Sequence, residues 1–113
     1  MAAAAICYVK GGNTEQQGHA CAMALKNLMG LVCDPVGGLV EVPCVKRNVG
    51  GAVNAMAAAD MALAGIESQI PVDQVIDAMK EVGDKMDVSL RETGVGGVAG
   101  SPKAAEVVER LNM

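Results

Sequence analysis

Two cysteines near the ends of one short stretch are the residues of this chain best suited to do chemistry. Residues 33–44 have the sequence CDPVGGLVEVPC, which places Cys33 and Cys44 eleven positions apart. Two prolines and two glycines make a continuous helix implausible from residue 31 to about residue 46, so a loop is expected there. A loop that folds back between helices can bring both thiols to one metal centre. The pattern alone also fits two buried structural thiols, because free cysteine is among the most buried residue types.

Other polar side chains near this loop have simpler explanations. Asp34 precedes a proline and is typical of a turn, although it shares the loop with Glu41 as a candidate acid or base. The basic Arg47 can hold a carboxylate, pair with Glu41 or stay solvated. His19 lies one turn into a helix without a second histidine or a carboxylate at ligand spacing, so a surface or capping role is expected. The glycines of residues 94–97 can cradle an anion, but a turn or a close packing contact is the simpler interpretation.

The composition argues against nucleic-acid binding and membrane insertion. Nine basic and thirteen acidic residues give a net charge of −4, and no basic cluster contains the aromatic residues that stack on bases. The longest apolar run, Met1–Val9, is too short to span a bilayer and lacks the basic start of a signal peptide. The chain is therefore expected in the cytoplasm with its cysteines reduced. Cys7 and Cys21 have apolar helix neighbours and are expected in the core.

Helical periodicity and capping signals predict an all-α chain of about five helices packed as a compact bundle. The expected helices cover residues 1–10, 14–29, 48–63, 71–86 and 101–111, with Cys33 and Cys44 on the Pro/Gly loop between the second and the third. Ser101 and Pro102 fit an N-cap and a first turn. The chain is long enough for one domain but not for two independent cores.

Small and aliphatic side chains must fill the interior, because hydrophobic residues make up 51% of the chain and aromatic residues only 1%. Thr14 is expected to begin the second helix with Gln17 as its capping-box partner. The third helix should be the most buried, with Val53, Met56, Ala59 and Leu63 at helical spacing. The last helix should turn Val107, Val108 and Leu111 inward. A mean hydropathy of +0.31 is high for so short a chain, so a partner is expected to cover some faces.

The stretch around the two cysteines resembles the signature of the iron-sulfur L-serine dehydratases. CDPVGGLVEVPC followed by VKRN is similar, nearly residue for residue, to the segment that carries two cluster cysteines in that family. Residues 11–16 (GGNTEQ), residues 55–65 and residues 91–97 (RETGVGG) also look like family segments. The resemblance covers in effect the whole chain and corresponds to the C-terminal part of the family's α chain or α domain.

The resemblance implies an enzyme that converts L-serine to pyruvate and ammonia with a 4Fe-4S cluster. In that family three cysteines hold the cluster and leave one iron open to the substrate, where the iron acts as a Lewis acid. Cys33 and Cys44 match two of these cysteines. The third belongs to a stretch upstream of this chain, and no other cysteine here matches it. Arg47 and Asn48 follow Cys44 closely and are candidates for contacting the substrate carboxylate.

By the same resemblance, residues 1–113 are a single domain and a fragment that is expected to be inactive alone. Activity would need the upstream α segment and the β chain or domain, and an oligomer is expected. No residue is assigned as the base, and threonine or cysteine remains an alternative to serine as substrate. Two other functions stay open from the residues alone: a small thiolate module that binds zinc structurally, and a helical assembly domain with inert thiols.

Overall fold

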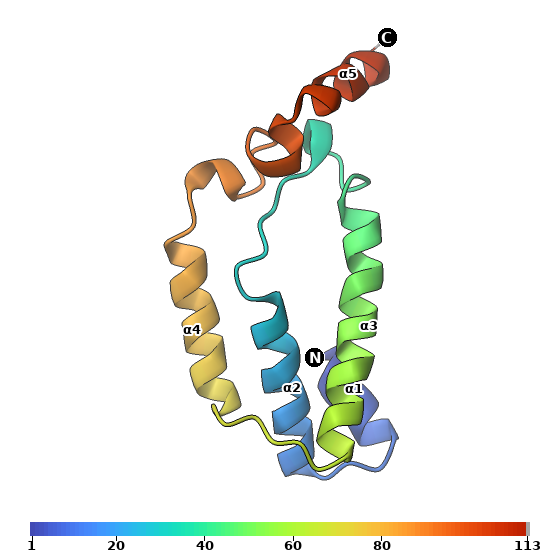
Figure 1. The fold of residues 1–113 in the computed structure, drawn as a ribbon, viewed down its shortest axis with the longest axis vertical. Coiled ribbons are helices and arrows are strands. Elements are labelled where there is room, and N and C mark those ends of the chain that lie inside the picture. The colour runs from blue at the N-terminus through green and yellow to red at the C-terminus, as the bar shows by residue number, and fades with distance from the viewer. Residues whose placement is uncertain (113) are drawn as a thin grey trace. The chain divides into compact units, whose positions relative to one another are not determined.

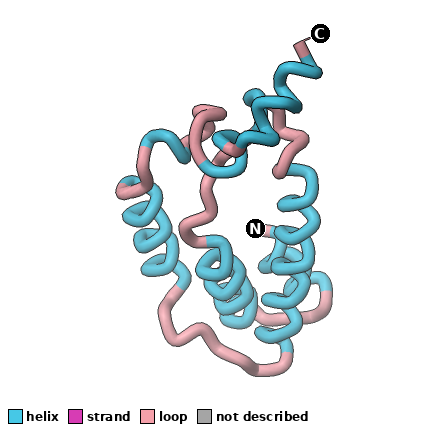
Figure 2. Tube along the Cα trace, turned by 45° about the horizontal axis from the view of Figure 1, so that its top comes forward, coloured by secondary structure: helices cyan, strands magenta, loops and turns pink. Residues whose placement is uncertain are grey.

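Helices make up the regular structure of this protein in the computed structural model, which describes residues 1–112 (Figure 1). The α-helices are α1 (Ala2–Val9), α2 (Thr14–Leu28), α3 (Cys44–Leu63), α4 (Val72–Asp84) and α5 (Pro102–Leu111). Three short 3₁₀ segments lie between them: η1 (Val36–Gly38), η2 (Val88–Leu90) and η3 (Gly97–Gly100). Figure 2 shows no strand among residues 1–112, so the predicted all-α class is confirmed. Over the same residues, no helix has both the length and the apolar character needed to cross a membrane.

The chain divides into two compact units. Unit 1 comprises residues 1–30 and 50–84, and unit 2 comprises residues 31–49 together with those from residue 85 onward. The long helix α3 begins in unit 2 and continues in unit 1. The expectation that residues 1–113 form a single domain stays a prediction.

Unit 1 is built around small side chains from three helices. Its buried core consists of Ala3, Cys7, Ala20, Met23, Ala55, Ala58, Ala59 and Ala62. Alanine lets helices approach closely. Gly12 lies just after α1, where its amide donates to the Cys7 carbonyl and a Cβ would come within 2.9 Å of that oxygen. The predicted core position of Cys7 is confirmed, whereas Cys21 is only half-buried.

The inward face of α3 differs from the predicted one. α3 contributes four fully buried residues, more than any other helix in the described chain, and all four are alanines. Of the residues predicted at helical spacing, Ala59 is buried and Leu63 packs against the core, whereas Val53 and Met56 are 61% and 52% exposed, so the prediction was wrong for these two. The periodicity was ambiguous because this helix is apolar on several sides, and its smaller side chains permit the closer packing.

The start of α2 is capped one residue earlier than the sequence suggested. The Asn13 side chain accepts a hydrogen bond from the Gln16 amide at 2.8 Å, and the Gln16 side chain accepts one from the Asn13 amide at 3.0 Å. This is a complete capping box, in which each side chain satisfies one unpaired amide of the first turn. Thr14 is the first helical residue, as expected, but the box formed by Thr14 and Gln17 was wrong.

Replacing Asn13 by alanine should therefore lower the free energy of unfolding of the chain by about 1 kcal/mol, because the cap bond and its return bond are both weakened. Urea denaturation followed by circular dichroism measures this loss. Thr14→Ala is the matched control and should change stability by less than about 0.5 kcal/mol. An equal loss in both variants would contradict the assignment of the cap.

The last two α-helices are amphipathic but only partly covered. In α4, Val75 is buried while Ile76 and Val82 are exposed. The start of α5 is as predicted, because the Ser101 hydroxyl accepts a bond from the Ala104 amide and proline occupies the first turn. Leu111 is 57% exposed, so its predicted inward orientation was wrong. Both helices thus expose apolar surface that the described chain does not bury.

Candidate metal-binding site

The loop before α3 folds back on itself, as its prolines and glycines suggested. The Val36 amide donates to the Val42 carbonyl at 2.9 Å, which closes the loop between its two halves. Gly37 and Gly38 make the reversal at φ values of +63° and +74°, which favour glycine. The loop is shorter than predicted, because α3 begins at Cys44 and not near Asn48. A proline at a helix start is well tolerated, and Pro43 directly precedes the first helical residue.

Cys33 is held through its backbone by a distant part of the chain. Its amide donates to the Leu90 carbonyl at 2.9 Å, and its carbonyl accepts from the Glu92 amide at 2.8 Å. These two bonds form an isolated parallel bridge between Cys33 and Arg91. The backbone is therefore fixed on both sides of Cys33, whereas the residue itself is exposed and its sulfur is free. No pattern in the sequence predicted the pairing of Cys33 with Arg91.

Asp34 is the most notable polar residue of the loop, because it is only 2% exposed. Its Oδ1 pairs with Arg47 Nη1, and its Oδ2 accepts a 2.6 Å bond from the Val98 amide. Arg47 Nη1 also donates to the Val32 carbonyl at 3.1 Å. A buried carboxylate is costly unless it is paired and hydrogen-bonded, and here it is both. We refer to the Asp34 carboxylate, the Arg47 guanidinium and the Val98 amide as the clasp.

The glycine-rich segment packs against the clasp. Gly97 has a φ of +62°, and a Cβ placed on it would lie 2.8 Å from both Cβ and Cγ of Asp34. The adjacent Val98 amide points to Asp34 Oδ2. Of the two sequence interpretations of this segment, the close packing contact is therefore confirmed. The Val98 amide donates its hydrogen bond to the carboxylate of Asp34, a residue of the same chain, and not to an external anion.

The pKa values of two groups are shifted at this site. Desolvation raises the pKa of the Cys33 thiol, and the nearby Glu92 and Cys44 add to the effect while Arg47 opposes it. Burial also acts to raise the pKa of the Asp34 carboxyl, but the bonds from the Val98 amide and from Arg47 outweigh it and leave this pKa lowered. Cys33 is thus a neutral thiol near neutral pH, and a bound cation must displace its proton.

The clasp changes the interpretation of the charged residues around Cys44. Arg47 pairs with Asp34 and not with Glu41, the partner considered from the sequence. Asp34 is not simply a turn-forming residue before proline, because its carboxylate is bonded to groups distant in sequence. Asn48 is exposed on the first turns of α3. The assignment of Arg47 and Asn48 to substrate binding stays a prediction.

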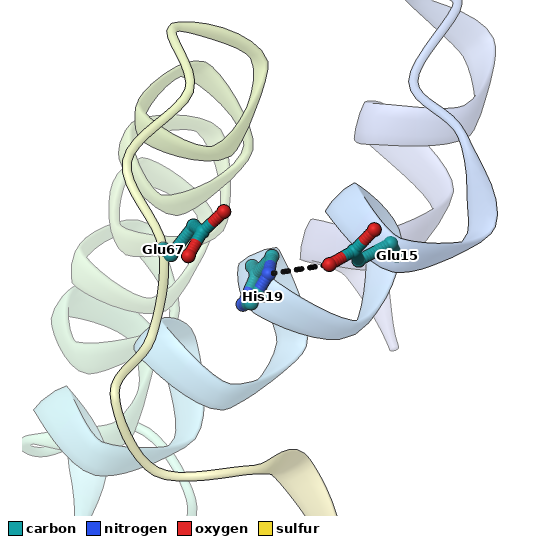
Figure 3. Close-up of side chains that lie close together, drawn as sticks. All are labelled: Glu15, His19 and Glu67. Carbon is teal, nitrogen blue, oxygen red and sulfur yellow. Dashed lines mark ion pairs between the residues drawn. The ribbon is translucent and has the colours of Figure 1, made fainter.

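A second group of potential ligands lies in unit 1 (Figure 3). Ligand atoms of Glu15, His19 and Glu67 lie within 4.8 Å of one another, and His19 Nε2 is 3.8 Å from Glu15 Oε1. Glu15 precedes His19 by one helical turn, and Glu67 follows α3, so the statement that no carboxylate lies at ligand spacing from His19 was wrong.

The hydrogen bonding of His19 nevertheless opposes metal binding. Its Nδ1 accepts a 3.1 Å bond from the Ser68 amide, so the neutral imidazole carries its proton on Nε2. A protonated Nε2 is a donor that faces the two carboxylates, and it has no lone pair for a metal. The imidazole instead supports the connection between α3 and α4, and we assign no metal to this group.

Fold and site together define an all-α protein that carries two free thiols on one folded-back loop. The sequence model of the family described as serine dehydratase alpha chain matches residues 1–99. Because that match covers most of the sequence, the chain belongs to the serine dehydratase alpha chain family.

Curated relatives agree with this assignment. The chain is 61% identical over 111 residues to the probable L-serine dehydratase, alpha chain, of Bacillus subtilis, and this covers 98% of the chain and 37% of the relative. It is 51% identical over 107 residues to the L-serine dehydratase, alpha chain, of Peptoniphilus asaccharolyticus, covering 95% and 37%. For L-serine dehydratase 1 of Escherichia coli the identity is 42% over 100 residues, covering 88% and 22%. The chain therefore spans between a fifth and two fifths of the length of these relatives.

Proposed function

We propose that this chain is part of an iron-sulfur L-serine dehydratase, in which Cys33 and Cys44 provide two of the three thiolates that hold a 4Fe-4S cluster. The observation that carries the proposal is the pair of free thiols on either side of one closed loop, in a chain of the serine dehydratase alpha chain family. The complete enzyme would be a lyase that converts L-serine to pyruvate and ammonia.

The donor set fits such a cluster. Iron-sulfur clusters are held by cysteine thiolates, and both sulfurs are free, with Cys33 exposed and Cys44 half-buried at the start of α3. When bound, a cluster with an open iron supplies a Lewis acid for the loss of the serine hydroxyl. The third thiolate would come from sequence outside these 113 residues.

Of the two residues predicted to contact the substrate carboxylate, Asn48 is the better candidate. Asn48 is exposed near Cys44 and offers an amide to a substrate carboxylate. Arg47 is the weaker candidate, because one nitrogen of its guanidinium is already bonded to Asp34 and Val32. Serine is the proposed substrate, with threonine and cysteine as competitors to be tested in the same assay.

The partners in this proposal are the remainder of the α chain and a β chain or domain. Exposed apolar side chains support a partner in both units, for example Val9 at 79% and Val53 at 61% in unit 1 and Val95 at 67% in unit 2. Large exposed apolar areas often mark an interaction surface. The free thiols suit the reducing cytoplasm, where the complete enzyme is expected to work as an oligomer.

The alternative of a structural zinc module finds less support. Structural zinc is almost always bound by four protein ligands. Within residues 1–112, the one group of three or more potential ligand atoms that lie close together is in unit 1 and contains neither Cys33 nor Cys44. A closed zinc site would therefore need ligands from another chain or segment.

Anaerobic iron-sulfur reconstitution of the α chain, with and without segments beyond these 113 residues, tests the proposal. In the extended chain, Cys33→Ser and Cys44→Ser should each abolish the cluster signal in electron paramagnetic resonance and the formation of pyruvate when a β chain is added. Cys21→Ser, a half-buried thiol on α2, is the matched control and should retain both. A cluster that survives loss of Cys33 or Cys44 would overturn the proposal, as would stoichiometric zinc without labile sulfide.

A further inference from the structure

The ion pair between Asp34 and Arg47 ties together the two chain segments that carry the thiols. Asp34 directly follows Cys33, and Arg47 lies three residues, about one helical turn, after Cys44. Arg47 Nη1 contacts both neighbours of Cys33, because it bonds to the Val32 carbonyl and to the Asp34 carboxylate. One guanidinium on the helix of Cys44 thus holds the backbone before Cys33 and the side chain of the residue after it.

The clasp is also joined to the glycine-rich segment. Asp34 Oδ2 accepts the Val98 amide at 2.6 Å, and Gly97 lies so close to the Asp34 side chain that only a hydrogen fits in place of a Cβ. The Cys33 backbone is bonded to Leu90 and Glu92 of the same part of unit 2. The position of Cys33 is therefore fixed from both chain directions by groups that lie far away in sequence.

Stability alone gives a weak reason for this arrangement. Well-packed apolar side chains often stabilise a protein as well as a buried ion pair does, since the charges lose their hydration. What an ion pair adds is direction, because a guanidinium and a carboxylate fit each other in few geometries. Residues next to a metal site commonly fix the orientation of the metal ligands through such hydrogen bonds.

We infer that Asp34 and Arg47 are positioning residues, which hold the Cys33 and Cys44 thiols in a fixed relative placement before any metal binds. The inference rests on the proposed function for its purpose, because the proposed ligands are these two thiols. It also gives Arg47 a role that differs from the substrate contact suggested by its place in the sequence.

The first test uses the reduced chain without metal. Dibromobimane links two thiols only when they lie close together, and peptide mapping identifies the Cys33–Cys44 product apart from products of other cysteines. Asp34→Asn and Arg47→Gln should each slow this cross-link several-fold. Arg47→Lys keeps the charge but loses the planar fork, so it should cross-link faster than Arg47→Gln but more slowly than the wild type. It also provides a test if Asp34→Asn or Arg47→Gln folds poorly.

Ser101→Ala provides the matched control. It removes the cap of α5 in the same unit and lowers stability without touching the clasp. The cross-linking rate should stay at the wild-type value in this variant. The inference is overturned if Asp34→Asn and Arg47→Lys cross-link as fast as the wild type, or if Ser101→Ala slows the reaction as much as they do.

A second measurement separates this inference from the proposed function. Co²⁺ bound by thiolates has charge-transfer absorption, and its affinity for the chain should fall about 10-fold in Asp34→Asn, as is usual when a residue that orients metal ligands is lost. Cys33→Ser and Cys44→Ser identify the ligands. If the cross-link depends on the clasp but the cluster of the extended chain survives loss of Cys33 or Cys44, the proposed function fails and the clasp stands. If Co²⁺ binds through them equally well in wild type and clasp variants, the clasp inference fails.

Discussion

A Gly97→Ala variant should lose about 2–5 kcal/mol of the stability of unit 2, from about 1–2 for left-handed backbone and about 1–3 for overpacking. The backbone term follows from the φ of +62° at Gly97. The packing term follows from the position of the new methyl group, which would lie 2.8 Å from Cβ and Cγ of Asp34. Asp34 cannot easily move away, because its carboxylate is held by Arg47 and by the Val98 amide.

Gly38→Ala separates the two contributions. Gly38 has a similar φ of +74° and belongs to the same unit, but a Cβ there meets no atom within 4 Å. Its loss should therefore be limited to the backbone term of about 1–2 kcal/mol. Hydrogen exchange of the amides of Glu92 and Val98 reports on unit 2 directly, and urea denaturation gives the total. Equal losses in both variants would show that Gly97 is not in close contact with Asp34.

Local signals in the sequence were sufficient to predict most helices. Ser101 and Pro102 begin α5 as expected, because a capping side chain and a proline act within one turn. The error at α2 was a single residue, since Asn13 and Thr14 are both good caps and each has a glutamine three positions later. Helix existence follows from local chemistry, whereas the choice between adjacent caps depends on how the chain enters the helix.

The orientation of α3 could not be obtained from its sequence. Its apolar residues include buried and exposed alanines, and periodicity does not say which side packs. The alanines pack inward because the core of unit 1 is made of close helix contacts, which Val53 or Met56 would hold apart. That choice depends on α1 and α2, so the predicted spacing was right for Ala59 and Leu63 but wrong for Val53 and Met56.

The cysteine loop was predictable as a feature, but the groups that hold it were not. Its prolines and glycines identify a folded-back segment, and the Val36–Val42 bond is consistent with that. The bond from Val98 to Asp34 spans 64 residues, and no local spacing relates the two positions. The nearest signal was the glycine-rich segment itself, because a glycine that needs positive φ and close packing often marks a backbone contact.

Asp34→Asn should lower the free energy of unfolding of the metal-free chain by about 1.5–3 kcal/mol at neutral pH, the usual value of hydrogen bonds to a charged group. Asparagine keeps the shape and one acceptor, but it removes the charge that Arg47 and the Val98 amide stabilise. The lower part of the range is the better expectation, since the Arg47 side chain is 37% exposed and solvent screens the pair.

The pH dependence of this loss has a definite sign. The pKa of Asp34 is lowered in the folded chain from an ordinary value of 3.8, so the unfolded chain takes up the proton first as the pH falls. The contribution of Asp34 is complete above that ordinary pKa and disappears as the pH falls through the folded one. Wild type and Asp34→Asn should therefore differ by a constant amount from neutral pH to about pH 5, and the difference should shrink as the pH falls below the ordinary pKa of 3.8.

Urea denaturation at a series of pH values measures both curves. Asp77→Asn, at an exposed carboxylate on α4, is the control and should stay within about 0.5 kcal/mol of wild type at neutral pH. A difference between wild type and Asp34→Asn that is unchanged at low pH would mean that lost packing, and not the charge of Asp34, causes the effect. Convergence would instead tie the stability of the cysteine loop to one buried carboxylate, the same group that we infer positions the two thiols.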